Sequence, residues 1–307
     1  MLYMKQMKSL AIFSLFVCFA GSLQAQLYKP KFGLRAGGNV TTIFGDKEEG
    51  LTESYGIATR ISIGATMKIA LHERFGVSTE LAFTQRGAPY SSSTDNSYLK
   101  LPNYGNSNAV KYTGYKRTYD VNVVNGYVEI PILGYAELIK DKLKLDIGAS
   151  IGFLVSSSSL GTLKYGEAQY IDAETPDLSK FIEINLTNNY LSQDIGETAA
   201  TSGTRSVKLD GTSRTYPSEI GAYYLNDYTE KEGENVFKTV DFGLQAGLSY
   251  NLTQGLLVGS RVYYGLTDIT NTRYDFSQLE LNTNGSYKAL EHKDSNFGVS
   301  FFIGLQF

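Results

Sequence analysis

The chain has 307 residues, of which 28 are Lys or Arg and 31 are Asp or Glu, so its formal net charge is −3 at pH 7. This balance excludes the strongly basic surface that nucleic-acid binding requires, and we expect no nucleic acid as a partner. Cys18 is the only cysteine, which excludes an intrachain disulfide.

Residues 1–25 have the layout of a secretory signal peptide. Two lysines precede an apolar run over residues 10–19, and Ala25-Gln26 offers a cleavage point, with cleavage after Ser22 as the alternative. The run is too short for a spanning helix, which needs about 20 apolar residues. We therefore expect residues 1–25 to be removed, and residues 26–307 to form one domain.

Eight segments of that domain alternate apolar and polar residues with the period of two that a strand shows. The last, residues 296–307, places Phe301, Ile303, Leu305 and Phe307 on one apolar face, and Phe302 is the exception on its polar face. The eight segments are about residues 31–42, 57–71, 75–84, 121–138, 143–155, 237–250, 256–269 and 296–307.

The connections between these segments alternate in length. Those at residues 72–74, 139–142 and 251–255 are short, whereas those at 44–56, 85–120, 156–236 and 270–295 are long. Short periplasmic turns and long outer loops are typical of outer-membrane barrels. We predict an all-β, eight-stranded, antiparallel, up-and-down transmembrane β-barrel with long extracellular loops and both termini periplasmic. A soluble lipocalin-like barrel is the alternative, but the polar faces carry too many charges for an apolar ligand cavity.

Three pieces of the sequence resemble the PorT-like outer-membrane β-barrel family of Bacteroidetes-type bacteria. They are residues 31–39 (KFGLRAGGN), 126–133 (GYVEIPIL) and 263–269 (YYGLTDI), and the terminal aromatic Phe307 completes the set. The resemblance skips the long connections. It implies a small barrel in the cell outer membrane, and a few members of the family assist protein export by the type IX route. The segment with Phe301, Ile303, Leu305 and Phe307 likewise resembles the C-terminal signal that barrel-insertion machinery reads.

The polar parity of the strands places ten charged residues inside the barrel, five of each sign. An eight-stranded interior is just wide enough for side chains to fill, so we predict a solid polar core in preference to an ion pathway. Inward glycines such as Gly64, Gly148 and Gly243 would make room for long side chains, and Pro131 predicts a β-bulge. The ten charged residues are Arg35, Arg60, Lys68, Glu80, Glu129, Glu137, Lys144, Asp146, Asp241 and Arg261.

Two histidines are the obvious candidates for catalysis. His72 lies in a short turn, and His292 lies beside Glu291 and Asp294 in the last long connection, with Ser286 and Ser295 nearby. No spacing separates this group from an ordinary polar loop. We predict no catalytic, cofactor-binding or metal-binding residues, and a lipid-modifying enzyme is the least favoured alternative.

The connection at residues 156–236 is too long to be a simple link. It holds 13 acidic and six basic residues, and its segment at residues 207–215 suggests a hairpin that turns at Asp210-Gly211. Its tyrosines suit recognition of an extracellular protein or glycan, whereas a hydrophilic screen next to lipopolysaccharide fits its polar clusters equally well. The tyrosines are Tyr165, Tyr170, Tyr190, Tyr216, Tyr223, Tyr224 and Tyr228.

These patterns together predict a non-enzymatic barrel that acts as an envelope or surface-interaction scaffold. An accessory role in protein export, with secretion components as partners, is the alternative. Outer-membrane lipid and lipopolysaccharide are the expected surroundings.

Overall fold

The computed structural model describes residues 30–47, 50–101, 110–168, 182–191, 203–209, 212–221, 235–271 and 293–307. The expected signal segment, residues 1–25, lies outside these ranges. Every regular element within them is a strand, and they contain no helix able to cross a membrane.

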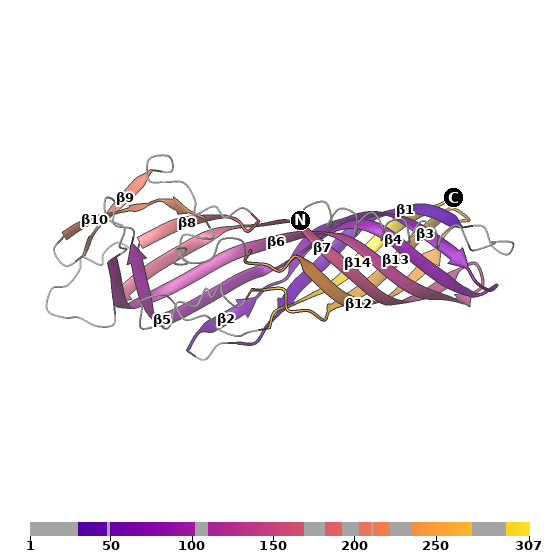
Figure 1. Cartoon of the computed structure of the whole chain (residues 1–307), viewed down its shortest axis with the longest axis horizontal. Coiled ribbons are helices and arrows are strands. Elements are labelled where there is room, and N and C mark those ends of the chain that lie inside the picture. Colours follow the sequence, from indigo (N-terminus) through magenta and orange to yellow (C-terminus); the bar gives the residue numbers. More distant parts are fainter. Residues whose placement is uncertain are drawn as a thin grey trace, which may run out of the picture.

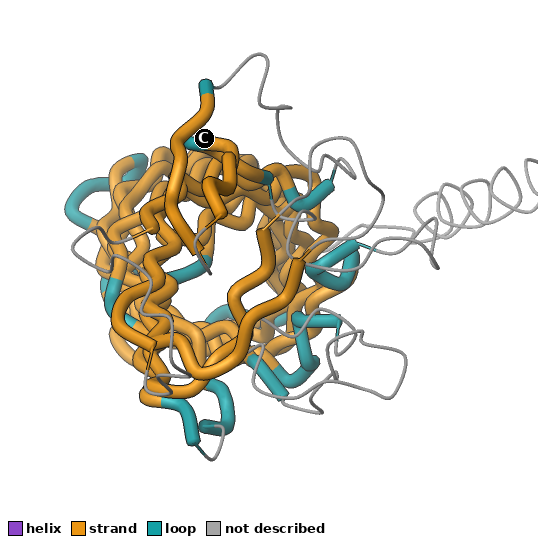
Figure 2. Tube along the Cα trace, turned by 90° about the vertical axis from the view of Figure 1, so that its left-hand side faces the viewer, coloured by secondary structure: helices purple, strands orange, loops and turns teal. Residues whose placement is uncertain are grey.

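Eight strands close into a ring, as the view along the barrel axis in Figure 2 shows. Each neighbouring pair is antiparallel, and β1 pairs with both β14 and β3, so the ring has no free edge. The predicted eight-stranded antiparallel barrel is confirmed. In ring order the strands are β1 (Lys31–Phe44), β3 (Ala58–Ala70), β4 (Phe75–Arg86), β6 (Val110–Ile139), β7 (Leu143–Ala168), β12 (Val240–Asn251), β13 (Leu256–Gly265) and β14 (Ser295–Gln306).

The two ends of the ring differ. Three connections at one end, which we call the turn end, are short and follow Ala70, Ile139 and Asn251. The backbones of Phe32 and Phe307 exchange hydrogen bonds of 3.2 and 2.9 Å at this same end. The longer connections leave from the opposite end, which we call the loop end.

Side chains of the ring alternate between its outside and its interior. On β14 the outward Phe301, Ile303, Leu305 and Phe307 are 53–76% exposed, whereas the inward Asn296 is fully buried. Phe302, the exception in the sequence pattern, lies inside the ring, where Arg35 and Arg261 stand over its aromatic face. The outside of the ring is therefore apolar, and its interior is polar with an aromatic insert.

Two strands of the ring are far longer than the others. β6 has 30 residues and β7 has 26, and both continue beyond the loop end, on the left of Figure 1. Further strands pair with these extensions: β5 with β6, β2 with β5, β8 with β7, and β11 with β8. We call this structure the distal sheet. It comprises β2 (Thr52–Tyr55), β5 (Pro89–Leu101), residues 110–124 of β6, residues 157–168 of β7, β8 (Ile182–Asn189) and β11 (Glu219–Ile220).

The distal sheet corrects the predicted loop boundaries. Residues 44–56, 85–120 and 156–236 were expected to be loops, but each contains a strand of the distal sheet. The prediction failed because β6 and β7 continue to pair with other strands beyond the point where their outward side chains cease to be apolar. The hairpin predicted within residues 207–215 is confirmed by the pairing of β9 (Thr204–Leu209) with β10 (Thr212–Pro217), in which Leu209 faces Thr212, whereas its expected turn, Asp210-Gly211, lies outside the described residues.

A change of register marks the border between the ring and the distal sheet. Gly126 pairs with Ser156 and Tyr127 with Leu154, so Val155 is the extra residue of a bulge on β7. The bulge predicted at Pro131 is absent, because Pro131 faces Ser150 in unbroken register with β7. Its missing N–H donor is accommodated without an inserted residue.

Candidate functional site

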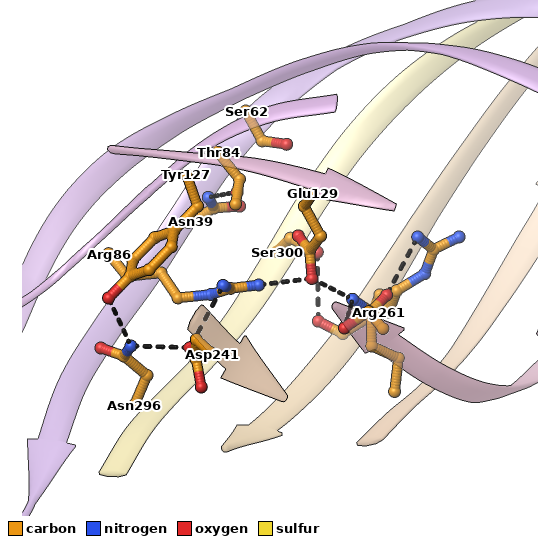
Figure 3. Close-up of polar contacts among 12 residues, drawn as sticks. Asn39, Ser62, Thr84, Arg86, Tyr127, Glu129, Asp241, Arg261, Asn296 and Ser300 are labelled. Atoms are coloured by element: carbon orange, nitrogen blue, oxygen red, sulfur yellow. Dashed lines mark hydrogen bonds and ion pairs between the residues drawn. The ribbon is translucent and has the colours of Figure 1, made fainter. Parts of the chain in front are cut away.

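The ring interior holds a continuous chain of polar side chains, part of which Figure 3 shows. Its members come from five strands and are all buried. In order of contact they are Asp241, Arg86, Glu129, Gln245, Arg261, Glu80 and Arg35. We call this set the lumen network.

Arg86 joins two acidic residues on the side of the network nearer the loop end. Its Nη2 donates to Glu129 Oε1 at 2.6 Å, and its Nη1 lies 3.5 Å from Asp241 Oδ2. The guanidinium also lies over the ring of Tyr263, 3.6 Å from the centroid. A Cβ at Gly243 would meet that ring at 2.4 Å, so the glycine makes the room that the tyrosine needs. Arg86 is thereby enclosed by two carboxylates and an aromatic face.

Arg261 and Arg35 share one acidic residue in the middle of the ring. Arg261 binds Glu80 with two parallel hydrogen bonds of 2.9 and 3.1 Å, and Arg35 Nε lies 3.1 Å from Glu80 Oε2. Both guanidinium carbons lie over Phe302, at 5.1 Å for Arg35 and 5.6 Å for Arg261. One carboxylate between two cations, with an aromatic face beneath them, satisfies charges that cannot reach water.

The remaining predicted charges lie outside this chain of contacts. Near the turn end, Lys144 Nζ lies 3.4 Å from Glu137 Oε1. Lys68 and Asp146 line a small cavity with Glu80 and Arg261. Arg60 stands apart, because its Nη2 donates to Asn122 Oδ1 and to Val123 O, both at 2.7 Å, where β6 leaves the ring.

Arg86 is the network member that sequence reasoning missed. The predicted third strand ended at Thr84, whereas β4 continues to Arg86. Arg86 continues the inward parity of Glu80 and Thr84, and extending that alternation by two residues would have found it. Gln245 joins Glu129 to Arg261, and nothing in the sequence indicated this contact.

The spaces beside the lumen network are of the size of water molecules. Two cavities, of about 30 and 20 Å³, lie among its residues. A cavity of roughly 10–15 Å³ holds one water molecule. Arg35, whose Nη1 makes no hydrogen bond, lines both of these spaces.

The interior of the distal sheet has the opposite character. Its buried hydrophobic side chains form one cluster of aliphatic and aromatic residues. Tyr165, Tyr190 and Tyr216 belong to that cluster and are at most 4% exposed. The expectation that these tyrosines offer contact area to a partner is wrong, because a sheet in water needs them as its core. Tyr170, Tyr223, Tyr224 and Tyr228 lie outside the described residues.

Burial alters the acidity of the tyrosines in this cluster. It raises the pKa of Tyr165 to about 12, and it raises the pKa of Tyr90 and Tyr119 further above the ordinary range. For Tyr165 and Tyr119 the nearby Arg117 acts in the opposite direction but does not outweigh burial. The three phenols are therefore neutral at physiological pH.

The described part of the catalytic candidate group has no arrangement that would activate a nucleophile. His72 stacks on Phe75 in a turn, with 4.7 Å between ring centroids. Asp294 accepts hydrogen bonds from the hydroxyls of Tyr55 and Thr270. Ser286, Glu291 and His292 lie outside the described residues. Within the ranges that the structure describes, no group of three or more His, Cys, Asp or Glu side chains could hold a metal ion.

Three similar solved structures are Ail of Yersinia pestis in complex with the heparin analogue sucrose octasulfate, OprG of Pseudomonas aeruginosa, and Neisserial surface protein A. Their identities are 8%, 10% and 9%, and their TM-scores 0.30, 0.33 and 0.27. The matches cover 91%, 91% and 90% of this chain, and 99%, 97% and 97% of the respective structures.

No curated protein matches the sequence. The family model described as "Outer membrane protein beta-barrel domain" matches residues 24–271, which is most of the chain. The chain belongs to this family of outer-membrane β-barrels.

Proposed function

We propose that this protein is a non-catalytic outer-membrane barrel whose distal sheet is an extracellular platform for surface interaction. In this proposal the lumen network is a structural core, the turn end and both termini face the periplasm, and residues 1–25 are the removed signal peptide. The outward apolar side chains contact membrane lipid, and Phe301, Ile303, Leu305 and Phe307 serve as the insertion signal. A protein or a glycan is the class of partner for the distal sheet.

The observation that carries this proposal is an inversion of faces along β6. Within the ring, Ile132 points outward with 61% exposure, and Glu129 is buried inside. Beyond the ring, Lys116 is exposed on the outward face, and Val121 is buried on the inward face. An apolar outside suits lipid, and a polar outside over an apolar core suits water. The inversion supports a membrane that ends near the loop end and a distal sheet that stands in water.

Single cysteines test this orientation, because Cys18 is the only native cysteine and belongs to the expected signal peptide. Lys116→Cys should react with a membrane-impermeant maleimide on intact cells. Lys140→Cys, at the turn end, is the matched control and should react only after the cells are broken, since both lysine side chains are more than half exposed. Labelling of Lys140→Cys alone on intact cells would reverse the orientation.

Removal of the distal sheet tests the surface role. Deleting only residues 156–236 would leave the apolar inner face of β5 and β6 uncovered, so both extensions must be removed together. A variant that joins Ala88 to Asn122, and Ser156 to Phe237, through short Gly/Ser linkers retains the whole ring. It should insert into membranes and show heat-modifiable migration on a gel.

Pull-down from solubilised outer membranes then compares this barrel-only variant with the full chain. A protein or glycan captured by the full chain alone would support the surface role. Equal capture by both would refute it. Co-purified secretion components would instead support the accessory export role that the PorT-like resemblance implies.

Conductance tests the structural role of the lumen. The cavities in the lumen are of the size of water molecules, and the charged side chains around them contact one another. We therefore expect no ion pathway through the ring, and the reconstituted protein should show no steady large conductance in planar bilayers. A reproducible open state on the nanosiemens scale would contradict a solid lumen.

A further inference from the structure

Arg117 is a buried charge of the distal sheet whose guanidinium makes no hydrogen bond with the described residues. It lies on β6 between Thr94 of β5 and Tyr165 of β7, and none of its surface is exposed. Its Nε, Nη1 and Nη2 make no hydrogen bond. Its guanidinium carbon lies over the ring of Tyr119, 5.9 Å from the centroid.

The arginines of the lumen network differ from Arg117, because each of them contacts a carboxylate. Arg86, Arg261 and Arg35 are equally buried, and each faces at least one carboxylate within 3.1 Å. A guanidinium keeps its positive charge in proteins, and burying it without an anion is strongly unfavourable. The tyrosines around Arg117 are neutral and supply no negative charge. Arg117 therefore has no carboxylate of the described residues in direct contact, and Glu53 approaches this group only through the Tyr90 hydroxyl, which donates to it.

A second unsatisfied donor lies beside Arg117. Ser92 precedes Thr94 by two residues on β5, so it faces the same side of the sheet, diagonally across from Arg117. Ser92 is fully buried, and its hydroxyl has no hydrogen-bond partner within 3.5 Å, although it is close enough to the Tyr90 phenol to oppose the rise in the pKa of that group. Two buried donors that lack acceptors on neighbouring strands indicate a common missing acceptor.

We propose that Arg117 and Ser92 form a binding site for an oxyanion in the interior of the distal sheet. A carboxylate, phosphate or sulfate presents two or more acceptor oxygens, which match the fork of the guanidinium and leave one for the serine hydroxyl. The oxyanion is either a free ion or a group carried by a larger molecule. This inference rests on the proposed surface role and adds the chemistry of one ligand to it.

Calorimetric titration of the full chain in detergent micelles tests the site. Inorganic phosphate, inorganic sulfate and acetate are the probes for a free ion, and glucose 6-phosphate is the probe for a carried group. All titrations are made at constant ionic strength, so that general screening does not differ among them. We expect saturable binding of at least one probe with one site per chain, and binding of glucose 6-phosphate would identify a carried group.

Three variants assign the binding to these residues. Arg117→Met should weaken it by at least about tenfold, because the charge and the fork are both lost. Arg117→Lys should weaken it less, and Ser92→Ala should weaken it by a few-fold. Arg205→Met is the matched control: Arg205 is exposed on β9 and donates to Glu183 O, so its loss should leave the affinity unchanged.

The absence of saturable binding for every probe would overturn the proposal, as would binding that Arg117→Met and Ser92→Ala leave unchanged. If hydrogen exchange shows that Arg117→Met unfolds the distal sheet, Arg117→Lys and Ser92→Ala decide the question. The cysteine labelling of Lys116 is independent of this result. Surface labelling without oxyanion binding would refute the site and leave the surface role intact, and the reverse outcome would refute only the orientation.

Discussion

The closed ring and the distal sheet share β6 and β7, yet their interiors follow opposite rules. In the ring, charged side chains fill the interior, and Glu80 and Glu129 hold arginines there. In the distal sheet, Leu163 and Tyr165 belong to an apolar core, beside which Arg117 is a buried charge. The same two strands thus serve a region with an apolar outside and a region with a polar outside, with a bulge at Val155 between them.

This difference teaches that the surroundings of a strand, and not its pairing, decide which face is apolar. Lipid offers no hydrogen bonds, so the outside of the ring must be apolar, and its polar side chains gather inside, where they satisfy one another. Water offers them freely, so the distal sheet turns polar residues outward and gains stability from its apolar interior. The bulge lets β7 change from one rule to the other without a break in the strand.

The largest effect should come from the centre of the lumen network. Glu80→Ala leaves Arg35 and Arg261 without the carboxylate that they share, and we expect the free energy of unfolding to fall by about 3–5 kcal/mol. Urea unfolding in micelles measures this. Glu73→Ala is the control, because Glu73 pairs with Lys140 in a contact where their side chains are 70% and 57% exposed, respectively. Its loss should change the free energy of unfolding by less than about 1 kcal/mol. Equal losses would show that the network does not stabilise the ring.

The core of the distal sheet should respond locally. Leu163→Ala removes a fully buried side chain of β7, and we expect a loss of about 2–5 kcal/mol confined to the distal sheet. Hydrogen exchange should report faster exchange there, while the heat-modifiable migration of the ring is unchanged. Leu160→Ala, on the opposite face of the same strand with 67% exposure, is the control and should have little effect. Loss of the ring with Leu163→Ala would mean that the two regions fold as one unit.

A lysine placed at two outward positions of β7 tests the inversion directly. Ile147→Lys puts a charge on the apolar outside of the ring, and we expect a cost of about 2–4 kcal/mol when the protein unfolds from lipid vesicles. Ser158→Lys puts the same charge on the outward face beyond the ring and should cost less than about 0.5 kcal/mol. Similar costs at both positions would refute the boundary between lipid and water.

The smallest effect concerns Asp294, which lies where the ring meets the distal sheet and accepts a hydrogen bond from Tyr55. We call this border the rim. Burial raises the pKa of the Asp294 carboxyl, although the hydroxyls of Thr270 and Tyr55 act in the opposite direction. Its pKa in the folded protein is therefore above the unfolded value of about 4, and the rim loses stability as the pH rises through the folded pKa. Asp294→Asn should remove this loss, by less than about 1 kcal/mol. Parallel stability-against-pH curves for the two proteins would contradict the assignment.

The lumen network shows which structural features the alternation of polar and apolar residues can predict. The alternation of polar and apolar residues was enough to place Arg35, Glu80 and Arg261 inside, because a strand turns successive side chains to opposite faces whatever surrounds it. It could not reveal that these three residues share one contact. That depends on which strands become neighbours in the ring, and Glu80 and Arg261 are 181 residues apart.

The sequence by itself determined the strand faces, the short turns and the apolar terminal segment, because each depends on residues that are adjacent in the chain. Only the tertiary structure decided that Arg86 joins Glu129 to Asp241, that β6 and β7 continue past the ring, and that Tyr165 and Tyr190 form a core. Those features depend on contacts between distant strands, and residues of the same type serve in one place as surface and in another as core. The unpaired charge of Arg117 became visible only when its neighbours on β5 and β7 were in place.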